Sequence, residues 1–300
     1  MAFHEGELAV QERAGVLEEA AHVGRFLRNH ISPGPRDFLE RRRFAVLAAS
    51  VPDGSVWTSI VAGPLPFLTA DEKGHFLRIG GLPRSTDSIA PGLVVGAHIG
   101  VVAIDFEARR RFRINGSLSE VLSDALVVQV DEAFSNCPKY IQAYVPRGDS
   151  RQPAEASHPS NGLDAAQTAW IGRTDLFFLG THHPLGGADV SHRGGASGFV
   201  RVVSPTELAW GDYHGNSLFQ SLGNAAVEPR AGLLFVDPES GSTLQLTGSL
   251  SIDWTAEAAA QIPRAERVLR FQVARVVETQ SAIPLRWILS GPSPFNPPAR

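Results

Sequence analysis

The spacing of hydrophobic residues changes near Phe44, and this change divides the chain into a helical start and a β-rich remainder. In residues 1–43, apolar side chains recur near the helical period among Glu, Gln and Arg. The segment 30–35 (HISPGP) interrupts the pattern, and residues 37–43 predict a further short helix. We therefore expect residues 1–43 to form an N-terminal helical segment.

From Phe44 onward, apolar residues come in short runs that are typical of β-strands. Turn-forming sequences, such as Pro52-Asp53-Gly54, separate the runs. The predicted strands of this part are residues 44–50, 57–62, 75–79, 99–106 and 112–121. Residues 44–125 therefore predict a first β lobe.

The middle of the chain predicts a helical linker over residues 126–174. Residues 126–144 have a helical pattern with an internal stop at Asn136-Cys137-Pro138, and residues 163–171 predict one more short helix. Between them, residues 145–162 are polar and proline-rich, which is typical of an exposed loop. β signals resume at Asp175, so residues 175–300 predict a second lobe, with a strand over residues 267–279.

The second β stretch repeats the first at a fixed offset of 132 residues. The matched pairs are Ser59 and Ser191, Gly63 and Gly195, Phe67 and Phe199, Gly100 and Gly232, Asp105 and Asp237, and Gly116 and Gly248. The copies differ where chemistry is expected, because Val61 stands at the position of Arg193. We predict two homologous lobes and one ligand site per chain, held chiefly by the second lobe.

Composition narrows the class of protein. Hydrophobic residues make up 43% and charged residues 19% of the chain, and the net charge is −4, so we expect neither nucleic acid nor an anionic membrane as partner. No apolar run approaches the length of a membrane span. The single cysteine, Cys137, excludes an internal disulfide and favours a cytoplasmic location.

The candidate chemistry lies in the second lobe. Ser191-His192-Arg193-Gly194-Gly195 sets a cation and a hydroxyl beside two glycines, and successive glycines let backbone N–H groups approach an anion. Asp212–Asn216 and Ser221–Asn224 supply further donors. A guanidinium suits a phosphate dianion better than an ammonium does, so Arg193 is the first candidate for binding a phosphorylated ligand.

These motifs resemble the FMN-binding split-barrel family of pyridoxamine 5′-phosphate oxidase-like proteins. The resemblance covers most of the chain, and it extends to a larger tandem subgroup of the family. The segments that carry it are 191–199 (SHRGGASGF), Gly215-Asn216, 221–224 (SLGN), 229–235 (PRAGLLF), 4–8 (HEGEL) and 136–142 (NCPKYIQ). It implies a mainly β fold with helical additions, in which two tandem split β-barrel lobes hold FMN at their interface.

The resemblance also implies roles for individual residues. Ser191, Arg193, Ser221 and Asn224 correspond to contacts with the phosphate or ribityl hydroxyls. The other expected cofactor contacts are His192, Gly194, Gly195, Asp212, Tyr213, Asn216, Arg111 and Arg113. For the two arginines, a solvated basic edge strand is an equal alternative. Candidate catalytic residues are His192, His214, Lys139 and Tyr140, and Arg286 and Trp287 are further candidates near the flavin.

Function is predicted as an FMN-dependent oxidoreductase that acts on a small organic substrate. The alternative is a non-enzymatic flavin- or haem-binding protein on the same barrel, since one fold hosts several functions. NADH or NADPH as electron donor and a homodimer remain open. His182, His183, His192 and His214 match no compact metal motif, and His4, Glu5 and Glu7 fit a solvated helix start, so we predict no metal site.

Overall fold

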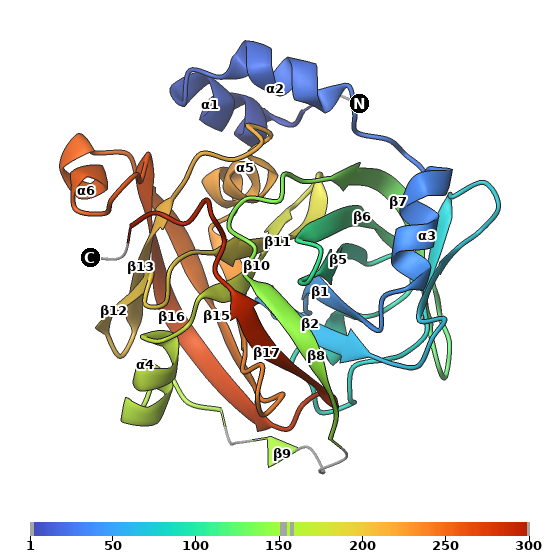
Figure 1. Cartoon of the computed structure of the whole chain (residues 1–300). Helices are drawn as coiled ribbons and strands as arrows, with labels where there is room; N and C mark the ends of the chain where they lie inside the picture. The colour runs from blue at the N-terminus through green and yellow to red at the C-terminus, as the bar shows by residue number, and fades with distance from the viewer. Residues whose placement is uncertain (1–2, 151–154, 157–158, 299–300) are drawn as a thin grey trace.

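The structure is a computed structural model that describes residues 3–150, 155–156 and 159–298. Two large antiparallel sheets lie side by side, one for each half of the chain (Figure 1). The first contains β1 (Phe44–Ser50), β2 (Val56–Ala62), β3 (Leu68–Ala70), β4 (Phe76–Ile79), β5 (His98–Asp105), β6 (Arg110–Val121) and β7 (Leu126–Ser135). A short 3-10 helix, η1 (Ala90–Gly92), lies between β4 and β5.

The second sheet follows the same plan. It contains β10 (Leu176–His183), β11 (Gly187–Gly194), β12 (Val200–Ser204), β13 (Glu207–Asp212), β14 (Arg230–Val236), β15 (Thr243–Asp253) and β16 (Arg267–Gln280). The short strand β9 (Glu155–Ala156) pairs with β16, and β8 (Ala143–Asp149) pairs with β17 (Leu285–Gly291) in a separate two-stranded sheet.

The two large sheets have the same strand order and register. The first runs β2-β1-β5-β6-β7-β4-β3 and the second β11-β10-β14-β15-β16-β13-β12. Val46 pairs with Val102 in the first, and Phe178 pairs with Leu234 in the second, at the predicted offset of 132. The longest hairpin of each sheet is bulged just before the matched glycine, Gly116 or Gly248. The predicted fold, mainly β with two tandem split-barrel lobes, is confirmed.

The lobes pack against each other through the strands that carry the repeat. Phe44, Val46, Phe178 and Leu234 belong to one buried cluster that spans both halves of the chain. β5 contacts β11 and β14 contacts β2, so the interface has an internal twofold character. This packing places the outer face of β11 in the second lobe opposite β6 in the first.

In the described residues, the helices that lie around the sheets are α1 (Glu5–Arg13), α2 (Leu17–Gly24), α3 (Pro33–Glu40), α4 (Ala165–Ile171), α5 (Gln220–Val227) and α6 (Ala256–Ala260). α1, α2 and α3 lie within the residues predicted as an N-terminal helical segment, while the bounds of that segment stay a prediction. α1 lies against α5, although the two are far apart in sequence (Figure 1). Gly6 and Gly223 allow this close contact, because a Cβ at Gly223 would lie 2.7 Å from the Cα of Glu7.

The predicted helix over residues 126–144 is wrong. Residues 126–135 form β7, which pairs with β6 across a short connection, and residues 143–149, predicted in part as a loop, form β8. Leu126, Val128 and Val130 are buried at every second position, which is the strand period. The first lobe's sheet therefore extends to Ser135, while the exact lobe boundaries stay a prediction.

Two smaller differences concern the second half. The segment 221–224, expected to supply hydrogen-bond donors, lies inside α5. The predicted strand over residues 267–279 is confirmed as β16, but it is followed by β17, so it is not the last strand. Within the described residues, no helix has both the length and the apolar character that crossing a membrane would require.

Candidate functional site

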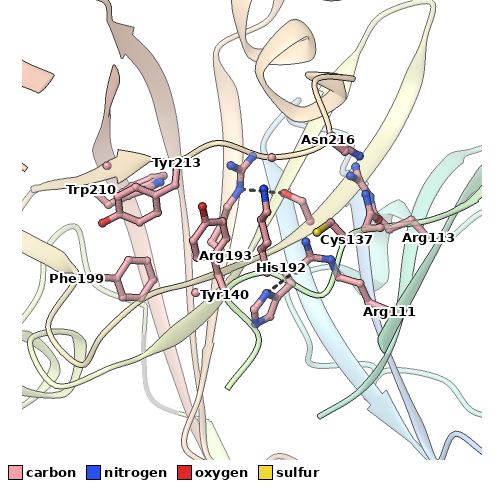
Figure 2. A pocket seen from close by; sticks show the side chains of 16 residues that line it. Arg111, Arg113, Cys137, Tyr140, His192, Arg193, Phe199, Trp210, Tyr213 and Asn216 are labelled. Atoms are coloured by element: carbon pink, nitrogen blue, oxygen red, sulfur yellow. Dashed lines mark hydrogen bonds between the residues drawn. The ribbon is translucent and has the colours of Figure 1, made fainter. Parts of the chain in front are cut away.

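A pocket of about 110 Å³ opens where the two lobes meet, between β6 of the first lobe and β11 of the second. We call it the cationic pocket. The segment after β7, the end of β13 and the following loop complete its wall (Figure 2). Its lining residues are Arg111, Arg113, Asn136, Cys137, Lys139, Tyr140, Ser191, His192, Arg193, Gly194, Phe199, Trp210, Gly211, Tyr213, Gly215 and Asn216.

Among the described residues, the lining carries four cationic side chains and no carboxylate. Arg111, Arg113, Lys139 and Arg193 come from three different segments, so the fold rather than local sequence brings their charges together. Burial lowers the pKa of Arg111 to about 9, and the charges of Arg113 and Arg193 act in the same direction. This value still leaves the guanidinium charged near neutral pH, which makes the pocket attractive to an anion.

Arg193 is held in place by neighbours behind the pocket wall. Its Nη1 donates to Asp212 Oδ1 at 2.8 Å, and its Nε donates to the Ser191 hydroxyl at 3.3 Å. Asp212 also lies 3.3 Å from Nη1 of Arg267, which is buried. Ser191 and Arg193 are two residues apart on β11 and therefore share one strand face. Asp212 thus positions the guanidinium without lining the pocket itself.

A second arginine is tied across the lobe interface. Arg113 on β6 forms a buried ion pair with Asp189 on β11. The Ser221 hydroxyl donates to Oδ2 of the same Asp189 at 2.6 Å and lies 2.9 Å from the Ser191 hydroxyl. Nε of Arg113 is buried and has no hydrogen-bond partner in the described residues. The pair therefore fixes the lobes relative to each other at the edge of the pocket.

His192 is fixed as a neutral imidazole. Its Nδ1 lies 3.1 Å from Nη1 of Arg111 and must accept, because a guanidinium only donates. Burial, together with the charges of Arg111 and Arg193, holds the pKa of His192 well below its usual value. The ring therefore carries its proton on Nε2, which is buried and has no partner among the described residues. As an imidazolium acid it is not poised near neutral pH.

Aromatic side chains form the wall that faces the arginines. Phe199, Trp210 and Tyr213 lie on one side of the pocket, with Arg111 and Arg113 on the other (Figure 2). The rings of Tyr140 and Tyr213 are 5.5 Å apart, and burial raises the pKa of Tyr213 to about 12, so its phenol stays protonated. Such a wall can contact a planar ring system while the opposite wall contacts an anion.

Most of the predicted site residues are brought together here. The ten that line the cationic pocket are Arg111, Arg113, Lys139, Tyr140, Ser191, His192, Arg193, Gly194, Tyr213 and Asn216. Five others do not line it: Gly195, Asp212, His214, Ser221 and Asn224. Asp212 and Ser221 support the lining residues from behind, whereas Nε2 of His4 bonds the Asn224 side chain at 2.9 Å.

Three of the candidates that do not line the pocket, His214, Arg286 and Trp287, have other partners. His214 is exposed, its Nδ1 lies 3.3 Å from Oε1 of Glu266, and its carbonyl accepts from the Tyr140 hydroxyl at 3.1 Å. Trp287 packs against Phe44 and Phe106 on the opposite side of the interlobe core, and Arg286 donates to backbone carbonyls beside it. Neither Arg286 nor Trp287 lines the cationic pocket.

Asn136, Phe199 and Trp210 line the pocket but were not among the predicted contacts. Asn136 and Cys137 belong to the NCPKYIQ segment, so that motif was a usable signal. Phe199 was recognised only as a repeat match, and Trp210 reads as an ordinary core residue because its ring is almost completely buried. Its Nε1 has no partner among the described residues, which leaves one more donor at the pocket.

The matching position in the first lobe is built differently. Ser59 and Val61 take the places of Ser191 and Arg193, and Thr243 and Gln245 take those of Arg111 and Arg113. Asp87 accepts from the Ser59 hydroxyl at 2.6 Å and from Nε2 of Gln245 at 3.0 Å. Among the described residues that line this first-lobe pocket, Asp87 therefore lies beside a single arginine, Arg84, so an anion is less favoured there than among the four cations of the second site.

Among the described residues, one His and carboxylate group brings three possible ligand atoms within 4.8 Å: His4, Glu5 and His183. Nδ1 of His4 accepts from Gly6 N at 3.1 Å as part of the cap of α1, and Nδ1 of His183 accepts from Gly186 N at 2.7 Å. Nε2 of His183 lies 3.1 Å from Oε1 of Glu5. The hydrogen bonds thus assign the group to anchoring α1.

No protein-family model matches the chain, and no curated protein matches it. Solved structures similar to part of it include a candidate pyridoxamine 5′-phosphate oxidase from Lactobacillus delbrueckii (17% identity, 39% of this chain, 94% of the other, TM-score 0.33). An FMN-binding protein from Syntrophomonas wolfei (11%, 37%, 82%, 0.29) and a FAD-binding protein from Mesorhizobium loti (11%, 43%, 99%, 0.31) are also similar. The names of these three proteins refer to pyridoxamine 5′-phosphate oxidase or to flavin binding, as does the family that the sequence motifs resemble.

Proposed function

We propose that the protein binds FMN by its phosphate in the cationic pocket and acts as a flavin-dependent oxidoreductase on a small organic substrate. The observation that carries the proposal is the convergence of four cationic side chains, with no carboxylate, in a pocket between the lobes. A phosphate dianion is the ligand group best matched to several guanidinium donors at once. The aromatic wall opposite them offers a surface for a planar ring.

The donor set of the pocket fits the phosphate. Nε of Arg113 and Nε1 of Trp210 are buried donors without a partner in the described residues, and buried donors normally have one. The enclosed volume of about 110 Å³ suits this anionic end, whereas whole small-molecule ligands occupy roughly 300–1,000 Å³. The remainder of the nucleotide therefore needs space beyond the enclosed pocket.

Different residues of the pocket would bind the phosphate and shield the site from water. Arg193, oriented by Asp212, and Arg111, which bonds His192, neutralise the phosphate. Tyr140 and Tyr213 limit access of water from the aromatic side. The bound flavin would supply the electron-transfer chemistry, and the protein would supply binding and electrostatics.

The test compares FMN with riboflavin, which lacks the phosphate. A hydrogen bond to a charged group contributes about 1.5–3 kcal/mol, so Arg193→Ala should weaken FMN binding by about 10–100-fold. Riboflavin affinity should stay unchanged, because the lost contact is to the phosphate. Quenching of flavin fluorescence measures both affinities. Arg173→Ala is the matched control, since Arg173 is an exposed arginine just before the second lobe and does not line the pocket.

Equal losses for FMN and riboflavin, or no loss for either, would contradict the phosphate assignment. Arg193→Lys guards against a misfolded alanine variant, because it keeps the charge opposite Asp212 and removes only the forked donor. It should weaken FMN binding less than Arg193→Ala does, again without effect on riboflavin.

The redox part of the proposal needs its own measurement. The visible spectrum of the purified protein distinguishes flavin bands from the Soret band of haem. If flavin is bound, anaerobic addition of NADH or NADPH should bleach it at a rate above that of free FMN. Flavin that binds but is not reduced faster than free FMN would favour the alternative of a non-enzymatic flavin-binding protein.

A further inference from the structure

A second and larger hollow, of about 700 Å³, lies at the other end of the same interlobe seam. We call it the acidic cleft. Four carboxylates line it, from α1, β7 and β11: Glu7, Asp131, Glu132 and Asp189. Within the part of the chain that the structure describes, no lysine or arginine lines it, although His4, His75 and His98 do. Its lining is therefore acidic in character, whereas that of the cationic pocket is basic.

The two hollows share their supporting strands. Arg113 of the cationic pocket and Asn115 of the acidic cleft are two residues apart on β6, and Ser191 and Asp189 are two apart on β11. The buried Arg113–Asp189 ion pair lies between them. A ligand in the cleft would therefore lie next to whatever occupies the pocket.

Two buried carbonyl oxygens in the lining have no partner. Asn115 is 8% and Gln220 is 4% exposed, and both line the cleft. Both side-chain amides donate to Oε2 of Glu132, which fixes their orientation, because a carboxylate only accepts. Oδ1 of Asn115 and Oε1 of Gln220 are then left without any donor in the described residues. Buried carbonyl oxygens normally accept a hydrogen bond, so two of them without a donor are uncommon.

We propose that the acidic cleft binds a small organic cation that carries N–H donors, namely a protonated primary or secondary amine. The carboxylates would supply the charge complement, and Asn115 and Gln220 would accept its N–H groups. The volume falls in the range of about 300–1,000 Å³ that is usual for small-molecule sites. The proposal goes beyond the flavin assignment and does not depend on it.

The cleft's surroundings disfavour the negative charge of two of its carboxylates, Glu7 and Glu132. Burial, together with smaller contributions from the charges of Glu132 and Asp189, raises the pKa of Glu7 to about 8. Burial also raises the pKa of Glu132. A positive charge placed among these carboxylates would favour their ionised forms. Within the described residues, the cleft's carboxylates are not clustered tightly enough to form a metal-binding group, which favours a cation with several atoms.

The experiment measures binding of 1,5-diaminopentane by calorimetry to the protein as purified, with 1,5-pentanediol and the bis-trimethylammonium analogue as comparisons. The diamine should bind at least tenfold more tightly than the diol, which lacks the charge. It should also bind more tightly than the quaternary analogue, which has no N–H group for the two carbonyl oxygens. Glu132→Gln should weaken the diamine by about tenfold or more.

Glu120→Gln is the control, because Glu120 is an exposed carboxylate on β6 outside the cleft, and it should leave binding unchanged. If Glu132→Gln does not fold by its melting curve, Glu7→Gln replaces it, since a glutamine can still accept from the His4 backbone. Equal affinity for diamine and diol, unchanged diamine binding in the folded variant, or binding of Mg²⁺ or Ca²⁺ in place of the diamine would overturn the proposal.

Discussion

At the scale of single residues, the arginines of the interface differ in how their charge is balanced. Arg113 pairs with Asp189 and Arg193 with Asp212. No carboxylate of the described residues pairs with Arg111. Its positive charge is instead repelled by the positive charges of Arg113 and Arg193. An anion bound beside Arg111 would neutralise this unpaired charge, as Asp189 and Asp212 do for Arg113 and Arg193.

Glu7 leads to a prediction about pH and stability. Its pKa is raised by burial to about 8, against an ordinary value of 4.5. Between these values the folded protein binds more protons at Glu7 than the unfolded chain does, so the free energy of unfolding should fall as pH rises. The contribution is fully present below about pH 4.5 and is lost as pH passes 8.

Glu7→Gln should remove this slope, because a neutral amide keeps the capping contact with His4 and has no proton to lose. Urea unfolding of both proteins at a series of pH values from 5 to 9 gives the difference, which should grow in favour of the variant as pH rises. A difference that does not change with pH would show that the Glu7 carboxyl is not titrating in that window.

The residues of the cationic pocket were predictable to different degrees. Alternation along one strand placed Arg111 and Arg113 on a common face, and the glycine-flanked Arg193 was recognisable from its own segment. Asp189 was not predicted, because its partner Arg113 lies in the other lobe and no local pattern announces an ion pair between lobes. Sequence reasoning therefore found the cations and missed the carboxylate that holds one of them.

At the scale of elements, the strand β7 shows where local pattern is ambiguous. Leu126-Val127-Val128 is a continuous apolar run, which fits a buried helix as well as a strand. Pairing with β6 through a four-residue connection decides the matter, because β7 completes the sheet between β6 and β4. Its counterpart β16 was predicted correctly, since its arginines alternate with apolar residues and mark the strand period.

The matching strands β2 and β11 lead to a prediction of one flavin per chain. β11 offers Arg193, whereas β2 offers Val61 and lies beside the Asp87 carboxylate. Fluorescence titration should therefore saturate at one FMN per chain, and Arg193→Ala should weaken this binding without revealing a second site. Saturation at two equivalents of similar affinity would mean that the first lobe binds phosphate despite its carboxylate.

At the scale of the whole molecule, the two copies of the repeat form the two halves of the interlobe interface. Only the second copy has the lining of the cationic pocket. Each lobe contributes a glycine where its own fifth strand meets the partner lobe, Gly100 against β11 and Gly232 against β2. The backbone contacts are therefore nearly symmetric, while the side chains above them are not. Substitutions at these two glycines can therefore distinguish an effect on interlobe packing from an effect on ligand binding.

The last prediction uses this pair of glycines. A Cβ at position 100 would lie 2.7 Å from the carbonyl carbon of Asp189, and one at position 232 would lie 2.6 Å from the carbonyl oxygen of Val56. Gly100→Ala and Gly232→Ala should each lower the free energy of unfolding by about 1–3 kcal/mol, since both overpack a buried contact. Only Gly100→Ala should weaken FMN binding as well, because it displaces the strand that carries Ser191 and Arg193. Urea unfolding and fluorescence titration of the two variants test this together, and equal loss of FMN affinity in both would indicate that the ligand depends on the interface as a whole rather than on β11.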